Sequence, residues 1–493
     1  MSLSDLPREI ILEIADHLDN AGMNALACTN GQVYNLLNKH LYRQDVAKPK
    51  SKSLTWAAKD GVEGTLQCAI HAGQYLHPIP QSFQIALQVA ANRGHMRLVE
   101  LLLKVDGINL NFTGGSLEAA PLCLAAKRGH SAISELLLAA DNIDPNIGDQ
   151  LSLTPLYWAC RMGNVSIVRQ LLARDDVSFN VIRYNSTQFT TPLTVACINS
   201  HVNIINLLLA KDGIDVNFHG GINGNTALMA AAKRGLVEVV ESLLARDDLE
   251  PNIVNNNGHH VLETAANLGR VDIVKLLLDH PDIDPNFVVR GGRTALMQAV
   301  GPDVVKLLLD QKGIKVNQQD HSGGTALYMA ARYPNFEVAK LLLEREDTDI
   351  NLPNNRGWTP LLWACVNGTL ELVDLLLEKS DIDPNPRDNN RGRTPLAHVC
   401  HRLGNHAVAI VSSLLSHPGT DPNAIDNNGV SILADFTNRW HRTGRHSEDA
   451  DNGIHRDSRR QRYYDINSLL CAAGARVETE IHSNSEDELD FLG

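Results

Sequence analysis

The sequence has little of what several broad protein classes require. Aromatic residues make up only 5% of its 493 residues, and basic residues are in the minority, so the net charge at pH 7 is −13. This deficit argues against general nucleic-acid binding and against an anionic membrane surface, because both reward a basic footprint. No apolar run approaches the roughly 18 residues that a membrane-spanning helix needs. We therefore expect a protein that has neither nucleic acid in general nor a membrane as its partner.

A secretory signal is also missing. The first residues, MSLSDLPREI, lack the basic and apolar regions of a signal peptide. We therefore expect an intracellular, cytoplasmic protein, with the nucleus left open as a second location.

Catalytic and metal-binding motifs are absent as well. The sequence contains no G-x-S-x-G, Walker or G-x-G-x-x-G motif, no kinase signature and no H-E-x-x-H pair. None of the eight cysteines forms a C-x-x-C pair, so a zinc site is not indicated. Most cysteines stand where related segments have alanine, which is typical of small buried apolar residues. We therefore expect no enzyme activity, no cofactor and no metal.

The clearest positive feature is a repeated segment, best seen between Thr226 and Asn252. Its first half begins at Thr226, a good N-cap, and ends at Gly235, which favours the left-handed conformation that closes a helix. Its second half carries valine and leucine at helical spacing and ends in Asp247-Asp248 and Pro-Asn, which stop a helix and start a turn. The segment predicts two short amphipathic helices that cannot bury their apolar side alone.

Segments of this kind recur about twelve times at spacings of 31 to 37 residues. Their first halves include TPLYWACRMG (154–163), TPLTVAC (191–197) and TPLLWACVNG (359–368), and their second halves include KLLLD (275–279 and 306–310). A period of about 33 residues with these motifs resembles the ankyrin repeat. The resemblance implies an all-α fold, in which residues 53–480 form a solenoid of helix pairs with β-hairpin-like fingers. The segments begin near Ser53, Ile85, Ala120, Thr154, Thr191, Thr226, His260, Thr294, Thr325, Thr359, Thr394 and Val430.

Some segments depart from the pattern. The second half of the segment from Ser53 is degenerate, which is typical of a capping repeat, and the segment from Thr294 is about three residues short. The last segment is interrupted by residues 439–462, which are rich in arginine and almost free of apolar side chains. We expect this insert to be a disordered surface loop, and residues 481–493 to be an acidic tail.

Residues 1–47 do not fit the repeat. They contain L-P-x-E-I at 6–10 and an Ile-x-x-x-Leu continuation at 14–18, and they resemble an F-box of the fungal type, followed by a linker at 48–52. The resemblance implies that the segment recruits the Skp-type adaptor of a cullin-RING ubiquitin ligase and that the repeats hold an unknown client protein. The alternative is an ankyrin scaffold or inhibitor whose N-terminal helices only cap the first repeat. The residues that would face the adaptor are Leu6, Pro7, Ile10, Ile14 and Leu18.

Arginine and tryptophan gather just before the threonines that open three C-terminal repeats. In the ankyrin family the fingers border a partner-binding groove, and arginine and tryptophan are frequent binding hot spots. In an acidic chain these basic positions would attract an acidic or phosphorylated segment of a client. The alternative is that they are solvated finger tips. The predicted client-binding residues are Arg290, Arg293, Arg356, Trp358, Arg387, Arg391 and Arg393.

Overall fold

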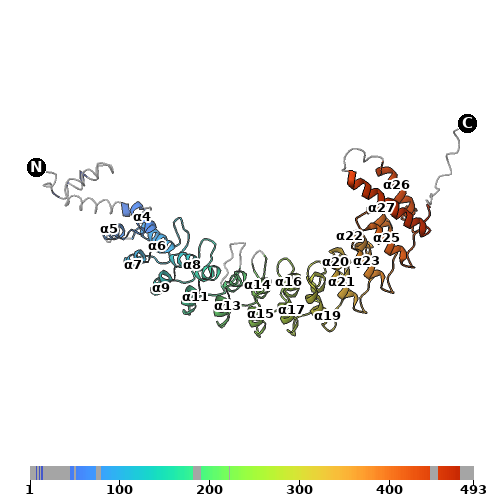
Figure 1. Cartoon of the computed structure of the whole chain (residues 1–493). Coiled ribbons are helices and arrows are strands. Elements are labelled where there is room, and N and C mark those ends of the chain that lie inside the picture. The colour runs from blue at the N-terminus through green and yellow to red at the C-terminus, as the bar shows by residue number, and fades with distance from the viewer. Residues whose placement is uncertain are drawn as a thin grey trace, which may run out of the picture. The chain divides into compact units, whose positions relative to one another are not determined.

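The computed structural model describes Pro7, Ile10 and residues 13–14, 45–48, 51–73, 79–180, 190–220, 223–444 and 453–477. The regular elements in these residues are helices, and twelve helix pairs, α4 to α27, follow one another along the chain (Figure 1). This arrangement confirms the predicted all-α fold of stacked helix pairs. The chain divides into two compact units, unit 1 (Met1–Glu250) and unit 2 (Pro251–Gly493).

In unit 1, first helices pack on first helices of the neighbouring repeats, and second helices pack on second helices. Two rows of helices result (Figure 1). The first helices are α4 (Lys52–Asp60), α6 (Gln81–Arg93), α8 (Pro121–Arg128), α10 (Pro155–Met162), α12 (Pro192–Ile198) and α14 (Ala227–Arg234). The second helices are α5 (Glu63–Gly73), α7 (Met96–Leu102), α9 (Ser131–Leu138), α11 (Val165–Leu172), α13 (Val202–Leu209) and α15 (Val237–Leu244).

Unit 2 is built in the same way. Its helix α18 has only four residues, in agreement with the short segment predicted after Thr294. The first helices are α16 (Val261–Asn267), α18 (Ala295–Gln298), α20 (Ala326–Arg332), α22 (Pro360–Asn367), α24 (Pro395–Arg402) and α26 (Ile432–Gly444). The second helices are α17 (Val271–Leu278), α19 (Pro302–Leu309), α21 (Phe336–Leu343), α23 (Leu370–Leu377), α25 (Ala407–Ser416) and α27 (Gly453–Ala472).

The ends of the first helices follow from the repeat motif. Thr154 is a typical N-cap, since its hydroxyl oxygen accepts a hydrogen bond from the Tyr157 N–H at 3.2 Å. The following Pro155 costs no hydrogen bond, because the first N–H groups of a helix have no partner within it. Gly163 closes α10 with φ of 79°, a left-handed conformation that glycine adopts without strain.

An asparagine after most of the second helices joins neighbouring repeats. The side-chain NH₂ of Asn351 donates to the Asp381 carbonyl at 2.6 Å, and its Oδ1 accepts from the Asp383 N–H at 2.8 Å. This asparagine clamp satisfies two backbone groups of the next repeat and so fixes the register of the stack. The same pair of bonds is made by Asn111, Asn146, Asn180, Asn217, Asn286, Asn317, Asn385 and Asn423.

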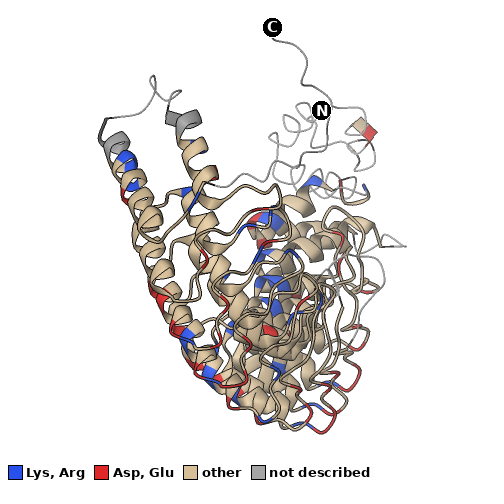
Figure 2. Ribbon diagram, turned by 90° about the vertical axis from the view of Figure 1, so that its right-hand side faces the viewer, with Lys and Arg blue, Asp and Glu red and all other residues tan. Residues whose placement is uncertain are grey.

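The prediction of a disordered insert at 439–462 is wrong at both ends of that range. Helix α26 continues to Gly444 and α27 begins at Gly453, while residues 445–452 lie outside the described residues. The Trp440 ring stacks on Tyr463 with ring centroids 4.3 Å apart, and Phe436 stacks on the same ring at 4.8 Å. These aromatic side chains extend the apolar faces of both helices into the polar sequence, and the two helices run side by side (Figure 2).

The first repeat is also more complete than its sequence indicates. Helix α5 has eleven residues and packs on α7, although its sequence departs from the repeat. The predicted linker at 48–52 overlaps the first helix, because Ser51 caps α4 and Lys52 is its first residue. Val46, near the end of the predicted F-box segment, is fully buried, and its carbonyl accepts a hydrogen bond from Ser82. The chain therefore joins the array from residue 45 onward.

The structure describes only part of the predicted F-box segment. Ile10 and Ile14 are helical, and the Ile10 N–H donates to the Pro7 carbonyl at 3.0 Å. Ile10 is 43% exposed. Leu6, Leu18 and the acidic tail at 481–493 lie outside the described residues. The F-box assignment therefore stays a prediction.

Candidate functional site

Unit 2 has a groove of about 830 Å³ on the fingers of three successive repeats. Its lining includes two arginines, four asparagines and three aromatic residues, and it contains no aspartate or glutamate. We call this feature the finger groove. It is lined by Ser322, Tyr328, Arg332, Asn354, Asn355, Arg356, Trp358, Trp363, Asn389 and Asn390.

Backbone hydrogen bonds hold the fingers of unit 2 against one another. The Asn355 N–H donates to the Ser322 carbonyl, and the Asn389 N–H donates to the Arg356 carbonyl, both at 2.9 Å. Equivalent bonds join Arg290 to Gly258, His321 to Gly291 and Asn427 to Arg391. Two asparagine side chains reinforce this finger ladder: the NH₂ group of Asn355 donates to the His321 carbonyl at 2.9 Å, and that of Asn389 donates to the Asn355 carbonyl at 3.1 Å.

Glycine permits the close approach of the fingers. Gly357 has φ of 75°, and a Cβ at this position would lie 2.8 Å from the Arg387 carbonyl oxygen and from the Asn389 nitrogen. The backbone conformation favours glycine here, and the neighbouring finger leaves no space for a side chain.

Aromatic rings form one wall of the finger groove. The Trp358 ring lies 4.6 Å from that of Trp363 and 5.1 Å from His398 of the next repeat, measured between ring centroids. The Tyr328 ring meets Trp363 edge to face at 6.2 Å, and the Arg332 guanidinium lies 5.6 Å from the Trp363 ring. Trp358 thus packs between neighbouring repeats while part of its surface remains exposed.

The structure brings some of the predicted client-binding residues together. Arg356 and Trp358 both line the finger groove, and Arg387 and Arg391 are exposed on the next finger. Arg290 and Arg293 belong to an earlier finger; both are exposed, and Arg293 lies 4.0 Å from the Asp320 carboxylate. Among the residues that the structure describes, no ion pair involves Arg356, Arg387 or Arg391.

Arg393 differs from its prediction. Only 7% of its side chain is exposed, and its guanidinium donates to the Asp435 carboxylate of the last repeat at 3.0 Å. A client cannot reach this group, because the pair is formed between two packed repeats. Arg393, directly before the N-cap Thr394, points toward the last repeat, whereas the tip residues Arg387 and Arg391 are exposed. Arg393 therefore stabilises the stack.

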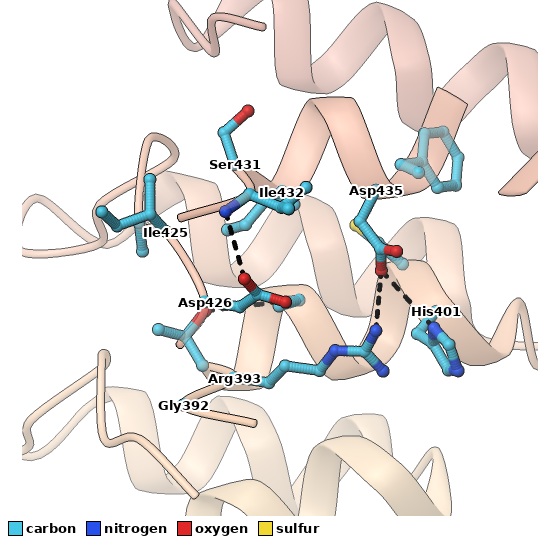
Figure 3. A pocket seen from close by; sticks show the side chains of 14 residues that line it. Gly392, Arg393, His401, Ile425, Asp426, Ser431, Ile432 and Asp435 are labelled. Atoms are coloured by element: carbon cyan, nitrogen blue, oxygen red, sulfur yellow. Dashed lines mark hydrogen bonds and ion pairs between the residues drawn. The ribbon is translucent and has the colours of Figure 1, made fainter. Parts of the chain in front are cut away.

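The surroundings of Arg393 leave no room for a ligand. Figure 3 shows Arg393 and His401 on the same carboxylate of Asp435. The cavity that these residues line has a volume of about 10 Å³. Burial lowers the pKa of His401 to about 4. The positive charges of Arg393 and Arg439 also lower this pKa, whereas the carboxylate of Asp435 raises it. A cavity of this size holds at most one water molecule. The network is a structural contact.

Sequence reasoning identified only Arg356 and Trp358 among the ten residues of the finger groove. The eight residues that it missed include Tyr328, Arg332 and Trp363. These three lie on first helices and not on the fingers, and TPLLWAC, which contains Trp363, was read only as a repeat motif. The available signal was the tryptophan itself. It stands at a position where most other repeats have a smaller side chain.

A match in sequence agrees with the recurring helix pairs, capping threonines and asparagine clamps of the structure. A description of ankyrin repeats, taken three copies at a time, matches residues 54–149, 87–183, 122–220, 178–253, 217–289, 281–354, 301–388 and 327–426. These overlapping stretches cover more than half of the chain. The chain belongs to the ankyrin-repeat family. Ankyrin arrays are protein–protein interaction modules, and the fold is typically a binding scaffold without catalytic activity.

Solved ankyrin structures resemble parts of the chain. The ankyrin repeat domain of Bcl-3 is 24% identical and covers 45% of this chain and 97% of its own, with a TM-score of 0.39. The human ASB11 ankyrin repeat domain is 23% identical, and the match covers 46% of this chain and 97% of that domain, with a TM-score of 0.39. The ankyrin repeat protein EF0377 is 27% identical and covers 40% and 99%, with a TM-score of 0.36. The comparison with curated proteins found no match.

The described residues contain neither a membrane-spanning helix nor a cluster of metal ligands. No helix in the described part of the chain has both the length and the apolar character needed to cross a membrane. Within that part, no three histidine, cysteine or acidic side chains are grouped as metal ligands.

Proposed function

We propose that the protein is a receptor that holds a client protein in the finger groove and recruits a Skp-type adaptor through residues 1–47. The observation that carries the client-binding half is the groove itself. Its two arginines and its aromatic wall are the side-chain types that dominate binding energy at protein interfaces. The ligase chemistry would belong to other subunits.

The finger positions favour a partner over a purely structural role. Arg356, Arg387 and Arg391 are exposed, and their side chains take no part in the finger ladder. The chain has a net charge of −13, so a small basic surface has an electrostatic potential opposite in sign to the net charge of the protein. This surface steers an acidic partner toward the fingers. Arg290 and Arg293 extend this basic surface along unit 2.

The adaptor half rests on the sequence motif. Leu6, Pro7, Ile10, Ile14 and Leu18 are the positions that carry the F-box resemblance. Ile10 is 43% exposed, so its side chain is accessible to an adaptor.

Co-purification tests the adaptor half. Full-length protein is expected to capture a Skp-type adaptor, and Leu6→Asp with Ile10→Asp is expected to abolish the capture while the thermal unfolding of the repeats stays the same. If the parent protein captures no adaptor, or the double variant captures as much as the parent, the protein is an ankyrin scaffold or inhibitor without a ligase link.

Proximity labelling tests the client half. The triple variant Arg356→Ala, Trp358→Ala, Arg391→Ala is expected to lose partners that the parent protein labels. A matched control removes three exposed cations from second helices, Arg169→Ala, Lys306→Ala and Lys340→Ala, and is expected to keep them. A folded triple variant that retains every partner would show that the groove is not the client site.

A further inference from the structure

Two tryptophans occupy the same position in repeats of different units. Trp158 and Trp363 each stand four residues after an N-cap threonine, Thr154 or Thr359. The Trp158 Nε1–H donates to Asp149 Oδ2 at 3.0 Å, and the Lys127 ammonium of the preceding repeat lies 4.0 Å from the ring centroid. In unit 1, therefore, a tryptophan, a cation and a carboxylate meet at one place.

Unit 2 has the same arrangement without the carboxylate. Arg332 corresponds to Lys127, and Asn354 corresponds to Asp149, five residues before the N-cap threonine. Asn354 Oδ1 accepts from the N–H groups of Arg356 and Trp358, each at 2.9 Å, and its NH₂ group donates to the Tyr328 hydroxyl at 2.7 Å. These three bonds fix the orientation of the amide and leave no side-chain oxygen to accept from Trp363.

The Trp363 Nε1–H is consequently a donor without a partner. It is buried and makes no hydrogen bond, in contrast to the Trp158 Nε1–H. A buried N–H that is neither bonded nor hydrated is costly, so an acceptor that reaches it gains more than an acceptor on an open surface. The finger groove, which Trp363 lines, gives the direction of approach.

The electrostatics of the groove select the acceptor. Arg332 and Arg356 line it, no acidic residue does, and Arg356 is exposed and forms no ion pair with any described residue. Two cations and an N–H donor without a counter-charge are complementary to a carboxylate.

We propose that the finger groove binds an acidic segment of the client, and that one aspartate or glutamate carboxylate of this segment supplies the acceptor that Asp149 supplies in unit 1. The carboxylate accepts from the Trp363 Nε1–H and pairs with Arg332 or Arg356. Because Nε1 is covered in the unbound protein, the acid enters by displacing a side chain at the edge of the groove. This inference rests on the proposed client-binding function and names the chemistry of the partner.

The probe is a phage library of random 12-residue peptides, selected on the full-length protein. Recovered peptides are expected to be enriched in aspartate and glutamate. Affinities are then measured by isothermal titration for one selected peptide and for its asparagine or glutamine counterpart, and the acid is expected to bind at least tenfold more tightly.

Three variants test the assigned atoms. Trp363→Phe keeps an aromatic ring and removes the N–H, and Asn354→Asp supplies an internal carboxylate as in unit 1; each is expected to weaken the acidic peptide about tenfold or more. Trp158→Phe removes a tryptophan N–H from the same position in unit 1 and is expected to leave affinity unchanged. A melting temperature of each variant shows whether the fold is retained.

The outcomes separate this inference from the proposed function. Peptides that fail to bind the triple variant Arg356→Ala, Trp358→Ala, Arg391→Ala but show no enrichment in acidic residues would refute the carboxylate. The groove would then remain the client site. Folded Trp363→Phe and Asn354→Asp variants with unchanged affinity would refute the assigned donor. A requirement for phosphoserine in place of aspartate or glutamate would also overturn it. Peptides that bind the triple variant as well as the parent would refute the groove itself.

Discussion

The finger before α10 in unit 1 and the finger before α22 in unit 2 share a pattern of backbone hydrogen bonds, and their first residues differ by one side-chain atom. In both, the first finger residue, Asp149 or Asn354, accepts two backbone N–H groups, and its own N–H donates to the residue four positions later. The second polar atom is an oxygen in Asp149 and a nitrogen in Asn354. The repeat therefore fixes the backbone of the finger, while one side-chain atom decides whether the tryptophan Nε1–H has an acceptor within the protein.

The largest expected effect on stability comes from a change in the finger backbone. Gly357→Ala is expected to lower the free energy of unfolding by about 3 kcal/mol, because the new Cβ requires a strained left-handed conformation and meets the next finger at 2.8 Å. Urea titration followed by circular dichroism measures the change. Gly291→Ala is the control: its φ is 89° but no atom lies within 4 Å, so about 1 kcal/mol is expected. Equal losses would contradict the role of finger contact.

Removing the carboxylate of unit 1 should make its finger resemble that of unit 2. Asp149→Asn is expected to cost about 2 kcal/mol, because the Trp158 Nε1–H loses a charged acceptor in a buried place. Guanidinium titration followed by tryptophan fluorescence measures the loss. Asp141→Asn makes the same change of charge at an exposed position and should stay within about 0.5 kcal/mol. A loss as small as that of the control would show that the hydrogen bond is unimportant.

Acid should also distinguish the units, since histidines with lowered pKa lie in unit 2. Burial lowers the pKa of His260 to about 4, so the folded protein keeps this imidazole neutral while the unfolded chain binds a proton below about pH 6.5. The contribution to stability is complete above that value and is lost as pH falls toward 4, by about 2 kcal/mol at pH 5.

His260→Thr restores the residue of the sister repeats and should remove this part of the pH dependence. Thermal unfolding at pH 7.5 and pH 5.0 measures it, with the exposed His219→Thr as the control. If the parent protein and His260→Thr lose the same stability between the two pH values, His260 does not carry the effect.

The smallest expected effect on stability comes from giving the finger of unit 2 the carboxylate that unit 1 has. Asn354→Asp should raise stability by up to about 1 kcal/mol, because it gives the Trp363 Nε1–H an acceptor. Differential scanning calorimetry measures the change. Asn390→Asp adds the same charge at an exposed place in the groove and should give no gain. An equal gain in the control would attribute the effect to charge and not to the tryptophan.

The repeats were predictable from sequence because their signals are local. Thr154 and Gly163 mark the ends of a helix through bonds to their own neighbours, and the same signals recur in the other repeats. The ends of the array were harder to predict. Trp440 and Tyr463 stack across an interruption of the sequence, and a polar composition between them concealed the helices.

The site was only partly predictable for a related reason. Arg356 and Trp358 could be placed on a finger, because finger residues precede the threonine motif. The inward position of Arg393 depends on Asp435, more than forty residues later, and the unpaired Trp363 depends on how the Asn354 amide is used. Neither partner can be identified from the pattern of a single repeat.

The asparagine clamp has a consequence for how such a chain evolves. The Asn351 side chain forms its hydrogen bonds to the next repeat with main-chain atoms of Asp381 and Asp383, so these bonds do not depend on which side chains that repeat carries. A duplicated repeat arrives with its own clamp and needs no compensating change in the repeats beside it. Selection can then alter the residues at the finger tips one at a time, while the stacking is inherited unchanged.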